Sequence, residues 1–342
     1  MAKPSRRQVL SALSAAGGAL LAGCTADPDE PNTKSNTPVT TVGGGTSPTE
    51  STQSVPESTE STQSVPEFPG DTASDACPPF DDAAQVVCYD AVDPQAMPVV
   101  LVPETQTVQL DQPTDFTLRN QSEQWFETNS HGWELYKRVD GDWYYIMPRA
   151  TPLPAYRLAA GEAHTWTLTV TTGSVSDGAA IDLVQGTESL SADGLGGGHY
   201  AFATDGEFEG VSYKEPTVLA TSFELQASPL ELTPRAAIAE VEWDGETLVA
   251  RSTRGEAGDD DGRDAYILER IDDPEPDAEE VIVEQVVRDN QLRDAIALSL
   301  EYEATRVRLE EFDRDFPLLR VDRTYEFRGD HYRVRTQAGE SS

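Results

Sequence analysis

Lysine, histidine and cysteine are all scarce in this 342-residue sequence. Lys+Arg totals 25 against 61 Asp+Glu, which gives a formal net charge of −36 at pH 7. Arginine supplies nearly all of the positive charge, because the lysines are only Lys3, Lys34, Lys137 and Lys214. A protein that binds nucleic acid neutralises phosphates with basic side chains, so nucleic acid is the least expected class of partner.

Catalytic motifs are also lacking. The four histidines, His131, His164, His199 and His331, are isolated in sequence, and no GxSxG, HExxH or Cys–His pairing occurs. Nucleophilic and metal-dependent hydrolysis therefore have no local signal. The sequence predicts no catalytic residue, no cofactor and no metal site, although a site assembled from distant residues stays open.

Two loops superficially resemble ligand-binding motifs. Residues 194–198 (GLGGG) precede His199 and an aromatic strand pattern, whereas a dinucleotide-binding fingerprint opens a helix. We expect a flexible loop there. The acidic run 259–261 lacks the alternating spacing and the distal glutamate of an EF-hand, so we expect a solvated loop rather than a calcium site.

The N-terminal apolar run, residues 9–21, is shorter than the roughly 20 residues that cross a bilayer core. It follows Lys3, Arg6 and Arg7 and ends at Leu-Ala-Gly-Cys24. A basic start, a short apolar segment and small residues are typical of a signal peptide. We therefore predict a signal peptide over residues 1–23.

The flanks of this segment resemble two known signals. Ser5-Arg6-Arg7-Gln8-Val9-Leu10 is similar to the twin-arginine export signal. Leu-Ala-Gly-Cys resembles the lipobox of prokaryotic lipoproteins, which implies cleavage before Cys24 and a lipid on its sulfur. The resemblance places the chain on the extracellular face of the cell membrane, lipid-anchored. The alternative is an uncleaved N-terminal anchor or a chance arginine pair.

The excess of carboxylates with little lysine resembles the proteins of halophilic archaea. Such self-repulsion destabilises a compact state at low ionic strength, and molar salt screens it over about 3 Å. An acidic protein that captures cations or basic partners is the alternative.

Residues 24–76 are rich in Ser, Thr and Pro and contain STQSVPE twice. Too little apolar surface is present to offset ordering entropy, so we predict a disordered tether. A bland spacer and an O-glycosylated stalk are both compatible with this composition. Cys77 and Cys88 then mark the start of the folded part, and in an extracellular setting we expect them to form a disulfide, with free thiols as the alternative.

Residues 97–232 show at least seven short strands with turn signals, such as Val139-Asp140-Gly141-Asp142. From His164 to Val170, apolar and threonine residues alternate, as in a half-buried strand. This pattern predicts an antiparallel β-sandwich. The tryptophans and tyrosines between Trp125 and Trp166 are either core or a sugar- or peptide-binding platform. Asn120-Gln121-Ser122, at a predicted turn, is either an N-glycosylation site or an ordinary turn.

The segments FTLRNQSEQ, WELYKRVDGDWYYI, YRLAAGEAHTWTLTV and GHYAF, within residues 100–225, resemble the Ig-like β-sandwich modules of secreted prokaryotic proteins. The resemblance implies an Ig-like domain over residues 77–233 and a role in binding, spacing or adhesion. The long insert at 172–198 departs from the pattern.

Residues 234–337 predict a small α+β domain that resembles no family. A hairpin is expected at Asp244-Gly245, and Asp277 is a candidate cap for a helix with Glu279 and Glu280 in its first turn. Leu292 to Leu300 continues the helical spacing, so two helices or one broken helix are expected, with a strand at the β-branched run 281–283 as the alternative.

Two functions remain open from the sequence. The first is a lipid-anchored cell-surface protein of a halophile that acts as a binding or envelope-interaction module. Its partners are the membrane, through lipid on Cys24, and an envelope protein or glycan. The second is an exported enzyme or solute-capture protein with a site between the two domains.

Overall fold

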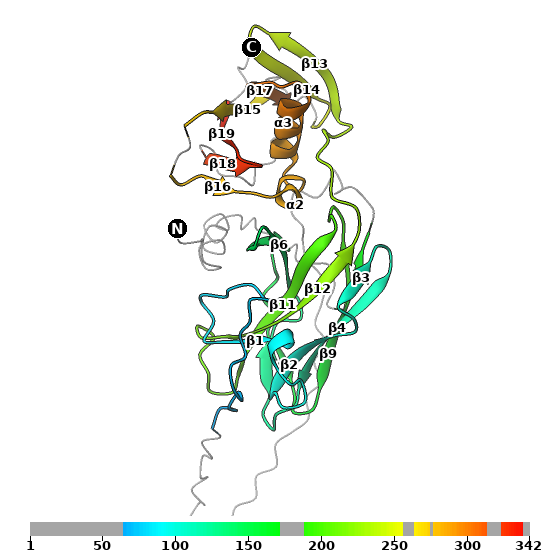
Figure 1. Ribbon diagram of the computed structural model, residues 1–342, viewed down its shortest axis with the longest axis vertical. Helices are drawn as coiled ribbons and strands as arrows, with labels where there is room; N and C mark the ends of the chain where they lie inside the picture. Colours follow the sequence, from blue (N-terminus) through cyan, green and yellow to red (C-terminus); the bar gives the residue numbers. More distant parts are fainter. Residues whose placement is uncertain (1–63, 172–187, 256–262, 274–275, 313–322, 338–342) are drawn as a thin grey trace, which may run out of the picture. The chain divides into compact units, whose positions relative to one another are not determined.

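The computed structural model describes residues 64–171, 188–255, 263–273, 276–312 and 323–337. These residues are mainly β and form three sheets (Figure 1). Val65–Ser342 belong to one compact unit. Arg6, Arg7 and Cys24 lie outside the described residues, as do the acidic run 259–261 and most of the predicted tether. No helix among the described residues has the length and apolar character needed to cross a membrane.

The first sheet has eight strands. They are β1 (Gln85–Cys88), β3 (Thr107–Gln109), β5 (Phe126–Thr128), β6 (Glu134–Val139), β7 (Asp142–Met147), β8 (Tyr156–Leu158), β11 (Gly198–Phe208) and β12 (Thr217–Gln226). The main order is β1-β12-β11-β5-β8, with β3 also beside β12, β6 beside β11, and β7 beside β6. A 3-10 helix, η1 (Tyr89–Ala91), follows β1.

The second sheet has four strands in the order β10-β9-β4-β2. They are β2 (Val99–Pro103), β4 (Pro113–Asn120), β9 (Ala163–Val170) and β10 (Ser189–Ala192). In β9, Trp166, Leu168 and Val170 are buried, while the threonines between them are half-buried. This confirms the strand predicted from the alternation, because apolar residues with a period of two share one face.

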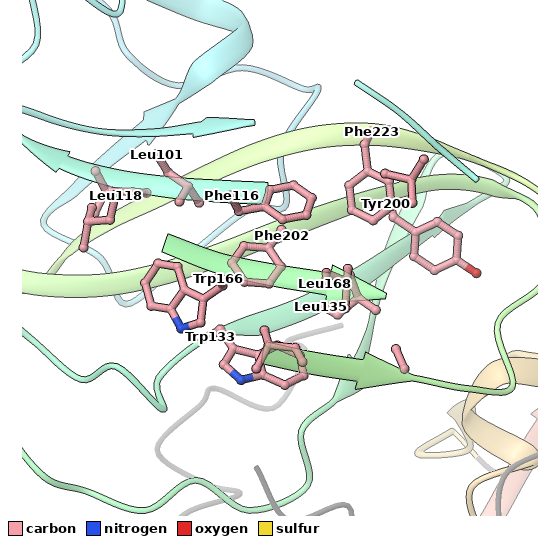
Figure 2. Packing of buried hydrophobic residues seen from close by; sticks show 14 of the residues in the cluster. Leu101, Phe116, Leu118, Trp133, Leu135, Trp166, Leu168, Tyr200, Phe202 and Phe223 are labelled. Atoms are coloured by element: carbon pink, nitrogen blue, oxygen red, sulfur yellow. The ribbon is translucent and has the colours of Figure 1, made fainter. Parts of the chain in front are cut away.

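The first and second sheets share one hydrophobic core. Phe116 of β4 stacks on Phe202 of β11 with ring centroids 4.5 Å apart, and Trp133 and Trp166 also contact Phe202. Figure 2 shows these rings side by side. Trp133 and Trp166 therefore belong to the core, so they are not available for a surface platform.

The third sheet has seven strands in the order β13-β14-β17-β15-β19-β18-β16. They are β13 (Ile238–Asp244), β14 (Thr247–Ser252), β15 (Asp264–Ile271), β16 (Glu279–Glu280), β17 (Arg306–Glu311), β18 (Arg323–Phe327) and β19 (Asp330–Gln337). The predicted hairpin joins β13 and β14, and Gly245 has the positive φ of 60° that such a turn needs. Helix α3 (Asn290–Glu301) packs against β15 and β17 (Figure 1).

The predicted start of a helix near Asp277 is wrong. Glu279 and Glu280 form β16 and pair with β18, and the short helix α2 (Val283–Val286) begins only afterwards. The neighbouring β-branched residues Val281 and Ile282 favour extended backbone, and burial of both side chains reinforces it. The second predicted helix is present as α3, whose N-cap, Asp289, accepts a hydrogen bond from the backbone nitrogen of Leu292 at 2.8 Å.

Helix α3 is buried on all sides from Gln291 to Ser299. The sheet covers one side, and the linker of residues 227–237 binds polar groups elsewhere on the helix. Arg235 of the linker donates to Asp294 from its backbone nitrogen at 2.8 Å and from Nε at 2.9 Å. Arg293 Nε donates to the carbonyl of Thr233 at 3.0 Å. The linker is thus held against α3 by hydrogen bonds to the charged side chains Arg293 and Asp294.

Candidate functional site

Buried polar groups link residues 65–226, which we call the N-terminal β region, to residues 238–337, which we call the C-terminal region. The contributing residues come from β6, from the turn before β11, and from α2 and the residue pair that follows it. We call this set the joint: Lys137, Gly194, Gly196, Glu284 and Arg288.

An ion pair between Lys137 Nζ and Glu284 Oε1 lies at the centre of the joint. The two side chains are 10% and 1% exposed, although 147 residues separate them in the sequence. The same Glu284 oxygen accepts a hydrogen bond from the backbone nitrogen of Gly196 at 3.1 Å. A buried charge costs several kcal/mol unless it is paired, so each partner requires the other.

Tyr200 completes the surroundings of this ion pair. Its hydroxyl donates to the carbonyl of Gly196 at 2.6 Å, and Lys137 Nζ lies 5.3 Å from the centre of its ring. Burial, and then the negative charge of Glu284, raise the pKa of Tyr200 well above its usual value. The phenol is therefore protonated and remains a hydrogen-bond donor.

Arg288 holds the same turn from the other side. Its Nη1 donates to the carbonyls of Gly194 at 3.0 Å and Glu284 at 2.7 Å, and its Nη2 donates to the carbonyl of Asp193 at 2.5 Å. The three carbonyls fix the guanidinium in one orientation. The glycine-rich run is a loop between β10 and β11, as predicted, and it is hydrogen-bonded and largely buried.

The glycines are required because backbones approach closely here. A Cβ on Gly196 would lie 2.5 Å from the backbone nitrogen of Leu230, and one on Gly197 would lie 2.1 Å from the carbonyl oxygen of Ala227. Both neighbours belong to the region where the linker begins. The glycine run thus allows the linker to pack against the turn that carries the joint.

Strand β7, which has β6 as its one partner strand among the described residues, also contacts the C-terminal region. Gln285 Nε2 donates to the carbonyl of Tyr145 at 3.0 Å. The pKa of Tyr144 is raised by burial and by its hydrogen bond with Glu280 of β16. Two strands at sheet edges, β7 and β16, are thereby covered where the regions meet.

The charged groups of the joint form contacts between the two regions. The charges of Lys137, Glu284 and Arg288 are directed at one another or at backbone groups, so they act by holding two regions together. Sequence reasoning missed the joint. One sequence signal pointed to it: Lys137 is one of only four lysines.

Cys77 and Cys88 form a disulfide and are 3% and 0% exposed. They pack with Ala203 and Ala220 of the first sheet. Asp90 lies near both sulfurs, and these three residues are the one group of metal-ligating side chains found close together among the described residues. Because both sulfurs are bonded to each other, neither is a thiolate that binds metal.

Asn120 is the last residue of β4 and is 1% exposed. Its Nδ2 donates to the carbonyls of Gln124 at 2.7 Å, Leu158 at 3.0 Å and Ala159 at 3.1 Å. This nitrogen is the atom that an N-glycan would join. In the folded chain this nitrogen is buried and hydrogen-bonded, which favours the alternative of an ordinary turn at Asn120.

The histidines are distributed over different elements. His164 on β9 contacts Trp166 at a centroid distance of 4.5 Å, and His199 is exposed on β11. His331 lies on β19 in the third sheet, and His131 lies in the turn before β6. The guanidinium of Arg157 lies over the ring of Trp125 at 4.3 Å, and Tyr145 and Tyr156 are 36% and 39% exposed, so part of the predicted aromatic platform reaches the surface.

No protein-family model matches this chain, and no curated protein matches it. Among solved structures it is similar to the sporulation control protein Spo0M of Bacillus subtilis, with 14% identity, a TM-score of 0.22, and coverage of 38% of this chain and 49% of that one. The chain thus spans about half the length of that protein. It is also similar to the CsuC–CsuE chaperone–tip adhesion subunit complex of Acinetobacter baumannii, with 14% identity, a TM-score of 0.23, and coverage of 50% and 76%. At such scores neither similarity supports a conclusion about fold or function.

Proposed function

We propose that this protein is a lipid-anchored protein on the extracellular face of the membrane of a halophile, where its folded part acts as a binding or envelope-interaction module. In this proposal residues 77–233 are an Ig-like β-sandwich and residues 234–337 a small α+β domain. The observation that carries the proposal is the joint. It links two β regions through buried charged groups that pair with each other and with backbone groups.

The disulfide supports an extracellular location. Disulfides persist in oxidising compartments, and Cys77–Cys88 lies just after the predicted tether. A tether anchored by lipid at Cys24 would end at this bridged, buried segment. Such an attachment suits a module that is held at a distance from the membrane.

The exported enzyme or solute-capture protein is the weaker proposal. It needs an accessible site between the two regions. At the joint, Lys137 and Glu284 are nearly inaccessible to solvent and pair with each other. A solute entering there would have to separate a buried ion pair.

Anchoring is tested by comparing wild type with Cys24→Ser and with Arg6→Lys/Arg7→Lys in a haloarchaeal host. Wild type should be found in the membrane fraction, with a lipid-sized mass increase at Cys24. Cys24→Ser should lose the lipid and be released, whereas the double arginine variant should accumulate in the cytoplasm as precursor. Wild type without lipid, or a Cys24→Ser variant that still fractionates with membranes, would contradict the proposal.

Halophilic adaptation has a separate test. The free energy of unfolding should rise as KCl increases from about 0.1 M to molar concentrations, because the Debye length shrinks from about 10 Å to about 3 Å. Stability that does not change over this range would argue against it.

A further inference from the structure

Strand β13 forms one end of the third sheet and pairs only with β14 in the part of the chain that the structure describes. It is seven residues long, and five of these residues are exposed. Trp243, near its end, is 52% exposed. An edge strand presents a row of backbone N–H and C=O groups to which another strand can bind.

The other sheet ends of the described residues are shorter or covered. Strand β16 has two residues and lies beside Tyr144 of the N-terminal β region. Strand β8 has three residues, β10 has four, and β1 has four with its last two buried. Four of the five residues of β2 are buried. Among these sheet ends of the described residues, strand β13 is therefore the longest, and most of its residues are exposed.

The two faces of β13 differ in chemistry. Glu240 and Glu242 lie on one face, where both pair with Arg251 of β14, at 3.1 Å and 2.7 Å. Their side chains are nevertheless 66% and 58% exposed. Val241 and Trp243 lie on the opposite face, where their cross-strand partners, Ala250 and Leu248, belong to the core.

Protein edges are commonly protected by charges and bulges. An irregularity between Ile238 and Glu240 disturbs the start of β13, but the register from Glu240 to Asp244 is unbroken. A large exposed aromatic side chain on an edge is the opposite of protection, because it adds apolar surface next to the open hydrogen-bonding row. Trp243 thus adds exposed apolar surface to the regular half of the strand.

We propose that the free edge of β13 binds an extended segment of a partner protein as an added strand, and that this segment alternates basic and apolar residues. Basic side chains would lie opposite Glu240 and Glu242, and apolar ones opposite Val241 and Trp243. The segment alternates because successive residues of a strand point to opposite faces. This inference rests on the proposed role as a binding module and names the class of its partner.

The test uses the mature chain with Cys24→Ser, which keeps it free of lipid, and a labelled seven-residue peptide that alternates arginine and valine. Binding is measured by fluorescence anisotropy in molar KCl, so that unspecific attraction to an acidic protein is screened. A peptide with its arginines grouped at one end, and one with alternate backbone amides methylated, are the controls. The alternating peptide should bind, and each control should bind at least about tenfold more weakly.

Charge exchange locates the site. Glu240→Lys/Glu242→Lys should weaken binding of the arginine peptide about tenfold, and the variant should instead bind a peptide that alternates glutamate and valine. The matched variant Glu209→Lys/Glu215→Lys changes two exposed acids elsewhere and should bind as wild type does. Hydrogen–deuterium exchange should slow across residues 238–244 when the peptide is bound.

Three outcomes would overturn the inference. These are equal binding of the grouped or methylated peptide, fast exchange in β13 with peptide bound, and protection of β13 already in the dilute free protein. Concentration-dependent self-association that protects β13 would assign the edge to a second copy instead. None of these measurements involves the lipid, so their failure is distinguishable from failure of anchoring at Cys24.

Discussion

The N-terminal β region and the C-terminal region differ in charge and in the kinds of side chains that they bury. Residues 65–226 contain 6 Lys and Arg against 25 Asp and Glu, whereas residues 238–337 contain 14 against 28. The core of the N-terminal β region is built from aromatic and aliphatic side chains of two sheets. The C-terminal region also has an apolar core, but it buries ion pairs and hydrogen-bonded charges around α3.

The difference shows how an acidic chain uses its few cations. At helix α3 of the C-terminal region, Arg235 of the linker pairs with Asp294 inside the fold, and the two side chains are 1% and 0% exposed. In the N-terminal β region the buried cation, Lys137, pairs with a carboxylate of the other region. Part of the positive charge is thus buried, where it joins segments that lie far apart in the sequence.

The largest expected effect is at Arg235–Asp294. Replacing Asp294 by Ala leaves the guanidinium of Arg235 buried without its carboxylate, which should cost about 3–5 kcal/mol of unfolding free energy. The double variant Arg235→Met/Asp294→Leu should recover most of this loss, because the loss comes from the buried charge that has no partner in the single variant. Urea denaturation in molar KCl measures both.

The exposed pair Arg157–Glu127 is the matched control, since the Arg157 side chain is 66% exposed. Arg157→Met should cost less than about 1 kcal/mol. If Asp294→Ala does not fold, Asp294→Asn can be measured instead, because its side chain keeps a hydrogen-bond acceptor. Asp294→Asn should still lose more unfolding free energy than the control Arg157→Met. Equal losses at the two sites would remove the distinction between the regions.

The next effect concerns the disulfide of the N-terminal β region. Cys77→Ser/Cys88→Ser should lose about 3 kcal/mol, since the bridge closes a short loop in the unfolded chain. Adding a reductant to the wild type should give a loss of similar size and should leave the double variant unchanged. A reductant effect on the variant would show that another mechanism is responsible.

Gly196→Ala tests the close approach at the joint. The new Cβ would meet the backbone nitrogen of Leu230, so the linker or the turn must shift, at a cost of about 1–3 kcal/mol. Ser191→Ala, at an exposed position nearby, should stay within about 0.5 kcal/mol of wild type. Thermal unfolding compares them, and a neutral Gly196→Ala would show that the contact is not tight.

The smallest effect is at Glu207 on β11. Burial, and then Glu127 and Asp205, raise the pKa of Glu207 above its unfolded value. Its contribution is therefore fully present below the unfolded pKa and is lost as pH rises through the folded pKa. Glu207→Gln should stabilise slightly at pH 7, by less than about 0.5 kcal/mol, with the gain vanishing in acid and in molar salt. A gain that is constant with pH would indicate packing instead.

Local patterns predicted local structure well. The alternation from His164 to Val170 and the Asp-Gly turns identified β9 and two hairpins, because strand period and turn chemistry lie within a few neighbouring residues. Glu279 and Glu280 were assigned to a helix because a cap signal precedes them. Their pairing with β18, about 45 residues away, decided otherwise, and no local window contains that partner.

The candidate site was beyond local patterns for the same reason. Lys137 and Glu284 lie far apart in the chain, and each alone has the pattern of a surface charge. The glycine run suggested a flexible loop. In the structure, the absence of side chains at Gly196 and Gly197 lets the backbone of residues 227–230 approach closely. The side chain of Asn120 turns inward to bind three carbonyls, which a three-residue sequon does not encode.

The most direct test of a single joined body is a double-mutant cycle at Lys137 and Glu284, followed by urea denaturation with tryptophan fluorescence and far-UV circular dichroism. Wild type should unfold in one transition by both probes. Lys137→Met should lose about 3–5 kcal/mol or split the transition in two, and Lys137→Met/Glu284→Leu should restore most of the stability. Two separate transitions in wild type, or single variants that unfold as wild type does, would contradict the joint as what holds the two regions together.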